Sequence, residues 1–337
     1  MINTSPAGTR EFINHVERKA LANQPLTWDE AVGVMKTSPD NIFDLIASAN
    51  RIRRKFKGVE ISLCSIINAK SGGCPEDCAF CAQSVHSSAD SPRFNLVSTD
   101  AILDGARSAL SAGAHKYGIV TSGYGYTGAS GKNELDSILT AVRKMKETVG
   151  IHRCASLGIL DESTAMELKN AGVLEYHHNL ETARSFFPQI CSTHDYEEDV
   201  ETVRVVKRAG LRACCGGIFG MGETPEQRVE LAFTLKELDV DSIPLNFLNP
   251  IKGTKLENMP PLKPFEILTI IAAYRMILPD KDIKVAGGRE KNLRDLQSLM
   301  FAAGANSTMV GNYLTTCGRP AEDDLQLIAD LELTVKK

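Results

Sequence analysis

Eight short, apolar, strand-like segments alternate with helix-like segments along most of this chain, and this alternation constrains the fold more than any other feature. We expect strands at 59–67, 116–121, 151–157, 174–180, 212–219, 242–248, 283–286 and 307–310. Between them, apolar residues recur at helical spacing. Repeated strand–helix units predict an α/β fold, a parallel (βα)8 barrel of the TIM type, with an open doubly wound sheet as the alternative.

The segments between the strands carry the usual signals of helix ends. We expect helices at 101–112, 134–149, 162–171, 197–209, 226–238, 265–278 and 293–303. Several end at a glycine such as Gly172, and Thr224 with Pro225 provides an N-cap and a first-turn proline. A polar helical extension is predicted for 1–58, with a capping box at Thr27 and Glu30, followed by the barrel at 59–316 and a helical tail at 317–337.

Composition narrows the class of protein. The chain has 337 residues, a net charge of −4 and no block of like charge, which argues against a nucleic-acid or anionic-membrane partner. It shows no signal peptide pattern and no apolar run long enough to span a bilayer, so we expect a cytoplasmic protein. Nine cysteines, an odd number, are then expected to be metal ligands, catalytic groups or inert core residues and not a disulfide framework.

Three of these cysteines form a compact motif after the first expected strand. Cys74, Cys78 and Cys81 follow the CxxxCxxC pattern, at the end of a barrel strand where barrel enzymes carry their active sites. Three thiolates can ligate three irons of a four-iron cubane and leave the fourth iron open for catalysis. A structural zinc site is the alternative, but it needs four ligands, and the next histidine, His86, lies in a polar stretch.

The motif resembles that of the radical S-adenosylmethionine superfamily, which places an aromatic residue before the third cysteine, as Phe80 is here. The resemblance implies that S-adenosylmethionine binds the open iron of a [4Fe-4S] cluster and is cleaved to a 5′-deoxyadenosyl radical. Phe80 is accordingly assigned to the binding site of this cofactor. No side chain is assigned a catalytic role, because the cofactors carry the difficult chemistry.

Other segments resemble the biotin synthase family over roughly residues 40–330. They are NAKSG at 68–72, AQS at 82–84, YHHNLET at 176–182, CCGGI at 214–218, AGGRE at 286–290 and GNYLTT at 311–316. The resemblance implies sulfur insertion into dethiobiotin to form biotin, with sulfur supplied by an auxiliary iron–sulfur cluster. It also implies a homodimer and a flavodoxin or ferredoxin as electron donor.

The same resemblance assigns three further residues. Asn179 and Glu181 stand where the family contacts the ribose of S-adenosylmethionine, and Asn179 also contacts dethiobiotin. Glu181 replaces a more familiar aspartate and reaches one methylene further. Asn246 matches the residue that binds the ureido ring of the substrate; a barrel-lining amide satisfied by the backbone is the alternative.

The auxiliary cluster site departs from the common pattern of three cysteines and one arginine. Cys154, Cys214 and Arg289 stand at three of those positions, but the fourth is Gly118, which has no side chain. Inward side chains of one barrel layer come from alternate strands, and Cys64 lies on the first expected strand. We therefore expect Cys64, Cys154 and Cys214 to hold the cluster beside Arg289, as [2Fe-2S] or a variant of higher nuclearity.

Simpler explanations exist for several of these residues. Buried cysteines such as Cys64, Cys191 and Cys215 are often inert, and Arg289 could be a buried ion-pair partner. For the whole chain, the alternatives are another barrel-type radical enzyme, similar to hydrogenase-maturation or methylornithine-forming enzymes, and a non-enzymatic iron–sulfur carrier. Conversion of dethiobiotin to biotin separates these possibilities.

Overall fold

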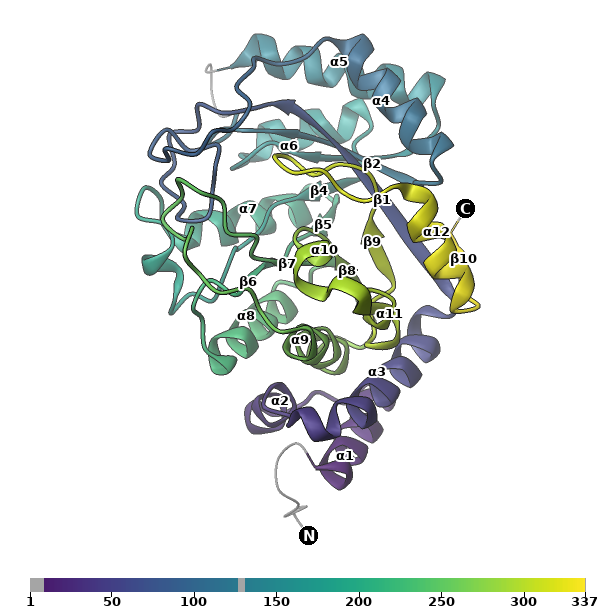
Figure 1. Ribbon diagram of the computed structural model, residues 1–337. Helices are drawn as coiled ribbons and strands as arrows, with labels where there is room; N and C mark the ends of the chain where they lie inside the picture. Colours follow the sequence, from purple (N-terminus) through teal and green to yellow (C-terminus); the bar gives the residue numbers. More distant parts are fainter. Residues whose placement is uncertain (1–8, 127–130, 337) are drawn as a thin grey trace.

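The computed structural model describes residues 9–126 and 131–336. Its centre is a closed parallel barrel, in which β1 pairs with both β2 and β9 (Figure 1). The strands are β1 (Glu60–Lys70), β2 (Lys116–Thr121), β3 (His152–Ser156), β4 (Glu175–His177), β5 (Arg212–Cys214), β6 (Gly217–Phe219), β7 (Ser242–Phe247), β8 (Asp282–Val285) and β9 (Ser307–Met309). The predicted barrel is confirmed, and the open sheet is excluded.

The fifth barrel position is interrupted, since β5 and β6 both pair with β7. Two glycines stand at this interruption, Gly216 before β6 and Gly217 at its first position. A Cβ atom on Gly216 would lie 2.0 Å from the carbonyl oxygen of Pro244, and one on Gly217 would lie 2.6 Å from that of Glu181. Glycine therefore allows the chain to pass close to β7 on one side and to the segment that follows β4 on the other.

Helices cover the outside of the barrel (Figure 1). They are α4 (Thr99–Ser111), α5 (Lys132–Thr148), α6 (Glu162–Ala171), α7 (Tyr196–Arg208), α8 (Pro225–Glu237), α9 (Pro264–Ile277), α10 (Arg289–Leu293) and α11 (Leu299–Ala302), with short 3-10 turns at Phe187–Gln189 (η2) and Arg294–Leu296 (η3). The helix expected at 293–303 is broken into these last pieces, because Arg294 has a φ of 53° and interrupts the helical backbone.

The N-terminal helices lie at one side of the barrel, outside α8 and α9 (Figure 1). They are α1 (Arg10–Leu21), α2 (Trp28–Met35) and α3 (Ile42–Lys57), with a 3-10 turn at Pro39–Asn41 (η1). The predicted capping box between Thr27 and Glu30 is present at the start of α2. α3 packs on α9, and α2 packs on α8. The first eight residues of the predicted extension lie outside the described residues.

The C-terminal segment returns to the first strand. It contains the expected helix, α12 (Ala321–Asp330), and an unpredicted strand, β10 (Thr334–Val335), which pairs in parallel with the beginning of β1. α12 lies beside β1 and β9 in Figure 1. Among the described residues, no helix combines the length and apolar character needed to cross a membrane.

Candidate active site

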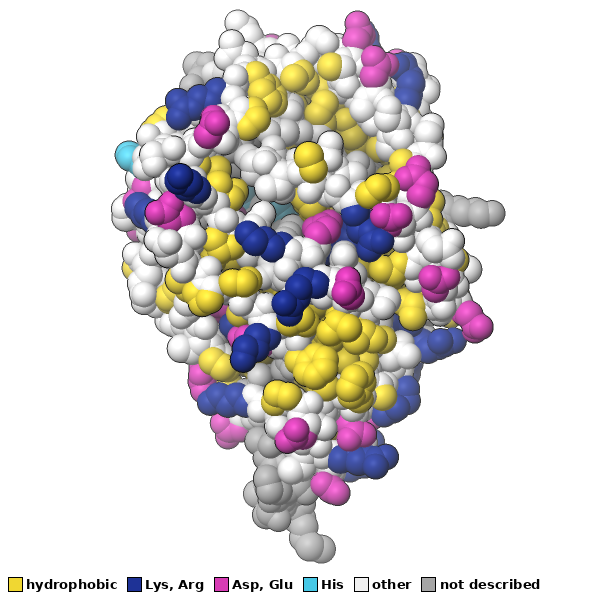
Figure 2. Space-filling view, viewed as in Figure 1, with side chains coloured by type: hydrophobic (Ala, Val, Ile, Leu, Met, Phe, Trp, Pro, Cys, Tyr) yellow, Lys and Arg dark blue, Asp and Glu magenta, His cyan; other side chains and the backbone are white. Residues whose placement is uncertain are grey.

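A cavity of about 460 Å³ lies inside the barrel and opens among the loops that follow the strands. Figure 2 shows a hollow near the centre of the corresponding face, rimmed by charged and hydrophobic side chains. The cavity brings together the side chains of Cys74, Cys78 and Cys81 near its mouth and those of residues on the barrel strands. Residues that are far apart in the sequence therefore line the same cavity.

The three-cysteine loop follows β1 and is held by its own hydrogen bonds. The amide of Cys81 donates to the carbonyl oxygen of Cys78 at 3.0 Å, and the Ser71 hydroxyl donates to Gln83 at 3.0 Å. The three thiols are free and half-buried. Burial raises the pKa of Cys74, and raises the pKa of Cys81 to about 11. Thiolates here need a nearby positive charge, which iron supplies, so the donor set fits the expected cubane.

A second set of thiols lies deeper in the same cavity. Cys64 on β1, Cys154 on β3 and Cys214 on β5 are buried and line it together. The structure therefore brings these three predicted residues into one ring on alternate strands. Burial raises the pKa of Cys214 to about 11 and raises that of Cys154 as well. These buried thiols again fit a metal cluster that compensates their charge.

Gly118 lies in this ring without contributing a ligand. A Cβ atom at this position would lie 3.7 Å from the Cβ atom of Cys154 and 3.3 Å from Cγ2 of Ile66. The position therefore faces the ring, where a side chain would contact Cys154 and crowd Ile66. Cys215 is fully buried but does not line the cavity, whereas Cys191 lines it close to Cys78.

Arg289 is not brought to the three thiols. It lies at the first position of α10, and its guanidinium donates to both carboxylate oxygens of Asp324 on α12, at 2.9 and 2.6 Å. It also donates to Gln297 at 2.9 Å and does not line the cavity. The geometry is that of the buried ion-pair partner considered above.

Lys284 occupies the place expected for Arg289. It lies on β8, at the seventh barrel position, and its buried Nζ donates to Sγ of Cys214 at 3.6 Å. Burial alone would lower the pKa of Lys284, but the charges of Cys214, Cys64 and Glu175 raise it. The cation at the ring is therefore a lysine. The sequence signal was available: Lys284 is an ionisable residue inside an apolar strand, in the layer that alternate strands define.

A buried ion pair completes the floor of the ring. Lys116 Nζ on β2 donates to Glu175 Oε2 on β4 at 2.7 Å, and Glu175 is 1% exposed. Burial opposes ionisation of Glu175, but the charges of Lys116 and Lys284 lower its pKa to about 2. Lys284 and Glu175 therefore line the cavity beside the thiols, and Lys116 holds Glu175 from below without lining the cavity itself.

The residues assigned to cofactor and substrate also line the cavity. Asn179 Nδ2 donates to Glu181 Oε2 at 3.3 Å, and Glu181 adopts a left-handed φ of 60°. Burial, with the nearby charge of Asp199, raises the pKa of Glu181 to about 8. Among the described residues, the hydrogen-bond partners of the Asn246 side chain are backbone groups: it donates to Gly217 O at 3.2 Å and accepts from Gly287 N at 2.9 Å. Phe80 lies at the mouth near the loop cysteines.

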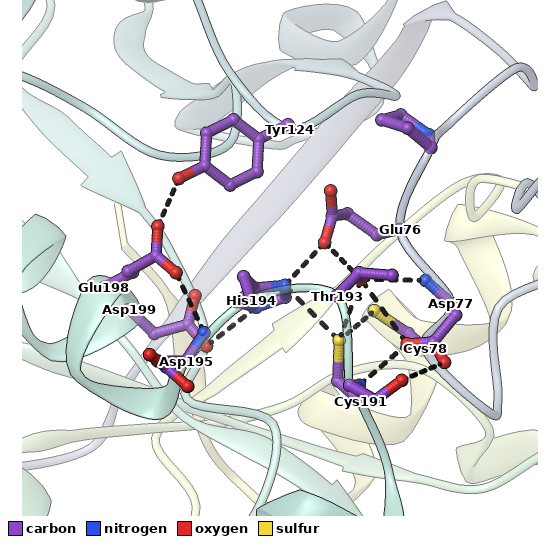
Figure 3. Close-up of polar contacts among 12 residues, drawn as sticks. Glu76, Asp77, Cys78, Tyr124, Cys191, Thr193, His194, Asp195, Glu198 and Asp199 are labelled. Carbon is purple, nitrogen blue, oxygen red and sulfur yellow. Dashed lines mark hydrogen bonds and ion pairs between the residues drawn. The ribbon is translucent and has the colours of Figure 1, made fainter.

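Sequence reasoning missed a polar network beside the three-cysteine loop (Figure 3). His194 Nδ1 lies 2.6 Å from Glu76 Oε2, and Asp199 Oδ1 accepts from His178 at 2.8 Å. Burial opposes protonation of His194, but hydrogen bonds with Asp199, Cys191 and Glu76 raise its pKa to about 11. The sequence offered no signal, because residue 76 and residues 191–199 are brought together only by the fold.

Comparison with known families is consistent with this geometry. Residues 69–235 match the radical SAM superfamily, and residues 244–334 match the biotin and thiamin synthesis associated domain. The first segment contains the cysteine loop and most of the ring. The second contains Lys284 and the C-terminal helix α12.

Curated relatives match over nearly the whole chain. A biotin synthase from Geobacter sulfurreducens is 57% identical over 329 residues, covering 97% of this chain and 99% of its own. One from Geotalea uraniireducens is 54% identical, covering 99% and 98%. One from Carboxydothermus hydrogenoformans is 50% identical, covering 94% and 97%.

Solved structures share the fold at much lower identity. Methylornithine synthase superposes with a TM-score of 0.81 at 17% identity, covering 96% of this chain and 97% of its own. The FeFe-hydrogenase maturase of Carboxydothermus hydrogenoformans gives 0.81 at 15% identity, covering 97% and 80%. These likenesses show the fold alone. The identity and coverage of the curated relatives show that the chain belongs to the biotin synthase family of radical S-adenosylmethionine enzymes.

Proposed function

We propose that this chain is a radical S-adenosylmethionine sulfurtransferase that inserts sulfur into dethiobiotin to form biotin. The observation that carries the proposal is one cavity with three thiols at its mouth and three more at its depth. Two cofactors placed there would face the same enclosed volume. Sequence identity of 50–57% to curated biotin synthases supports the same reaction.

In this proposal the chain's residues bind, orient and shield. Cys74, Cys78 and Cys81 ligate the [4Fe-4S] cluster and leave one iron without a protein ligand. Cys64, Cys154 and Cys214 ligate the auxiliary cluster, and Lys284 balances their negative charge. When bound, the first cluster supplies the electron that cleaves S-adenosylmethionine and the second supplies sulfur.

The polar residues between the two sets of thiols orient the small molecules. With a pKa of about 8, Glu181 is mostly protonated at neutral pH, so its carboxyl group can both donate and accept a hydrogen bond with a ribose diol. Asn179 is positioned by Gly216 N, which donates to its Oδ1 at 3.2 Å. Asn246 can exchange its backbone partners for the ureido group of dethiobiotin, which presents the same donor and acceptor types as a peptide.

Phe80 contributes an apolar wall beside the cofactor. By analogy with the family, the proposal extends to a cytoplasmic homodimer that receives electrons from a flavodoxin or ferredoxin. It also extends to the division into an N-terminal extension, a barrel and a C-terminal tail. In that division, Arg289 and Asp324 join the barrel to the tail.

The test is anaerobic reconstitution of the full chain with iron and sulfide, followed by turnover with S-adenosylmethionine, a reductant and dethiobiotin. We expect 5′-deoxyadenosine and biotin by mass spectrometry, with loss of cluster sulfide. Cys78→Ala should abolish both products, whereas Cys317→Ala, which removes an exposed thiol, should not change them. Formation of 5′-deoxyadenosine without biotin would indicate another barrel-type radical enzyme, and absence of both would indicate a carrier.

A further inference from the structure

A second group of metal-ligand side chains adjoins the three-cysteine loop. One ligand atom from each of Glu76, Cys191 and His194 lies within 4.8 Å of the other two. Glu76 belongs to the loop itself, and the other two residues belong to the segment between η2 and α7. Figure 3 shows the three side chains pointing toward one another, with Cys78 next to Cys191. No role in the reaction proposed above uses this group.

The distances within the group suit a single ion. Cys191 Sγ lies 3.3 Å from His194 Nδ1, which lies 2.6 Å from Glu76 Oε2. Cys78 Sγ lies 3.9 Å from Cys191 Sγ. Two sulfurs bound to one tetrahedral zinc at about 2.3 Å are separated by roughly 3.8 Å. The two thiols are therefore at the spacing of ligands to one ion, and the histidine and carboxylate need to open by a fraction of an ångström. Cys78 Sγ does not lie within 4.8 Å of all three other ligand atoms, so its side chain has to move toward the ion when the ion binds.

The surroundings orient the histidine as in established metal sites. His194 Nε2 faces Asp199 Oδ2 at 3.4 Å, so its other nitrogen, Nδ1, is directed toward Cys191 and Glu76. A carboxylate behind a ligating histidine fixes the ring and its tautomer. Asp199 is itself held by His178 at 2.8 Å and is 3% exposed. The histidine is thus positioned before any ion binds.

The loop that carries Cys191 is anchored to the cysteine loop. Asp77 accepts from the Ser192 amide at 2.8 Å and from its hydroxyl at 2.7 Å. Cys191 is 4% exposed, and the His194 and Glu76 side chains are 11% and 12% exposed. Thiolate and imidazole ligands favour Zn²⁺ or Fe²⁺ over Mg²⁺ or Ca²⁺.

We propose that Glu76, Cys191 and His194, together with Cys78, bind one divalent thiophilic cation such as Zn²⁺ when the cubane is absent. Because Cys78 is shared, this ion and the cubane exclude each other. The chain would then have a mononuclear metal form that must lose its ion before the cluster assembles. This inference depends on the cluster-free protein only, and it stands or falls independently of sulfur insertion.

The experiment uses the full-length, cluster-free chain under anaerobic conditions, with Zn²⁺ as the probe. Competition against a chromogenic chelator measures affinity, and zinc X-ray absorption measures the ligands. We expect one tight Zn²⁺ with two sulfur and two nitrogen or oxygen ligands. Cys191→Ser and His194→Gln should each weaken binding by at least about tenfold. Cys81→Ser is the matched control, because it disrupts the three-cysteine loop but leaves the proposed site intact.

The competing outcome is zinc held by the three loop cysteines. It would show three sulfur ligands, weakening by Cys81→Ser and no effect of Cys191→Ser, and it would overturn the proposal. The absorption measurement needs no substitution, so it remains decisive if a variant fails to fold. We also expect one equivalent of Zn²⁺ to slow cubane assembly in the unsubstituted chain but not in Cys191→Ser. Equal slowing in the two proteins would also refute the shared site.

Discussion

Replacing Lys284 by methionine tests the electrostatics of the deep thiol ring. The substitution removes a buried cation whose Nζ lies 3.6 Å from Cys214 Sγ while keeping an unbranched side chain of similar length. At an effective dielectric constant of about 20, a unit charge pair at this separation interacts by ~5 kcal/mol. This corresponds to roughly a several-thousandfold change in the thiolate fraction of Cys214 at a given pH. Water that enters the cavity screens the pair and reduces the effect.

Two assays follow from this magnitude. In the cluster-free protein, the rate of Cys214 alkylation can be measured across pH by mass spectrometry, and its rise should shift to higher pH in Lys284→Met. After anaerobic reconstitution of Lys284→Met, the amount of iron and sulfide beyond that of the first cluster should fall. Lys284→Arg keeps the charge and should retain both properties, while Lys144→Met, on the exposed face of α5, should behave as the unsubstituted chain. Unchanged alkylation and full metal content in Lys284→Met would refute the reasoning.

Three other predictions concern neighbouring groups. Cys64→Ala should lose the iron and sulfide of the auxiliary cluster and retain the iron and sulfide of the first cluster, as measured by metal and sulfide analysis. Full retention of both clusters would remove Cys64 from the ligand set. Asp324→Asn should lower the free energy of unfolding, measured in denaturant, by about 3–5 kcal/mol, because it leaves Arg289 without its buried partner. The iron content should not change. A loss of auxiliary iron without destabilisation would instead place Arg289 at the cluster. The pKa of Glu175 is lowered from 4.5 to about 2, so its contribution to the free energy of unfolding is present above about pH 4.5 and is lost as pH falls toward 2. Over this range the unsubstituted chain should lose roughly 3 kcal/mol more stability than Glu175→Gln, measured by denaturant unfolding at each pH. If the stability of both proteins changed equally with pH, this assignment would be contradicted.

The fold could be predicted from the sequence because barrel strands and helices carry local signals. β2 (Lys116–Thr121) and α6 (Glu162–Ala171) have the predicted bounds. The fifth strand was predicted as continuous, because backbone contacts of Gly216 and Gly217 that divide it are tertiary. The two-residue β10 was missed because only pairing with β1 makes it a strand.

The candidate site also has parts that the sequence predicts and parts that only the fold creates. The loop cysteines lie close together in the sequence, and the ring of Cys64, Cys154 and Cys214 follows from the alternate-strand rule. The resemblance does not identify Lys284, because it points to Arg289, five residues later, where the chain has already left β8 for α10. The group of Glu76, Cys191 and His194 could not be predicted, because its members come from two loops that only the fold places side by side.

The central claim is that Cys74, Cys78 and Cys81 hold a cubane with one iron free of protein ligands. Electron paramagnetic resonance of the anaerobically reconstituted and reduced chain, before and after addition of S-adenosylmethionine, tests it most directly. The account predicts a reduced [4Fe-4S] signal that changes when S-adenosylmethionine binds and that is absent in Cys78→Ala. A cluster signal that does not respond to S-adenosylmethionine, or a protein that contains only zinc after reconstitution, would contradict it.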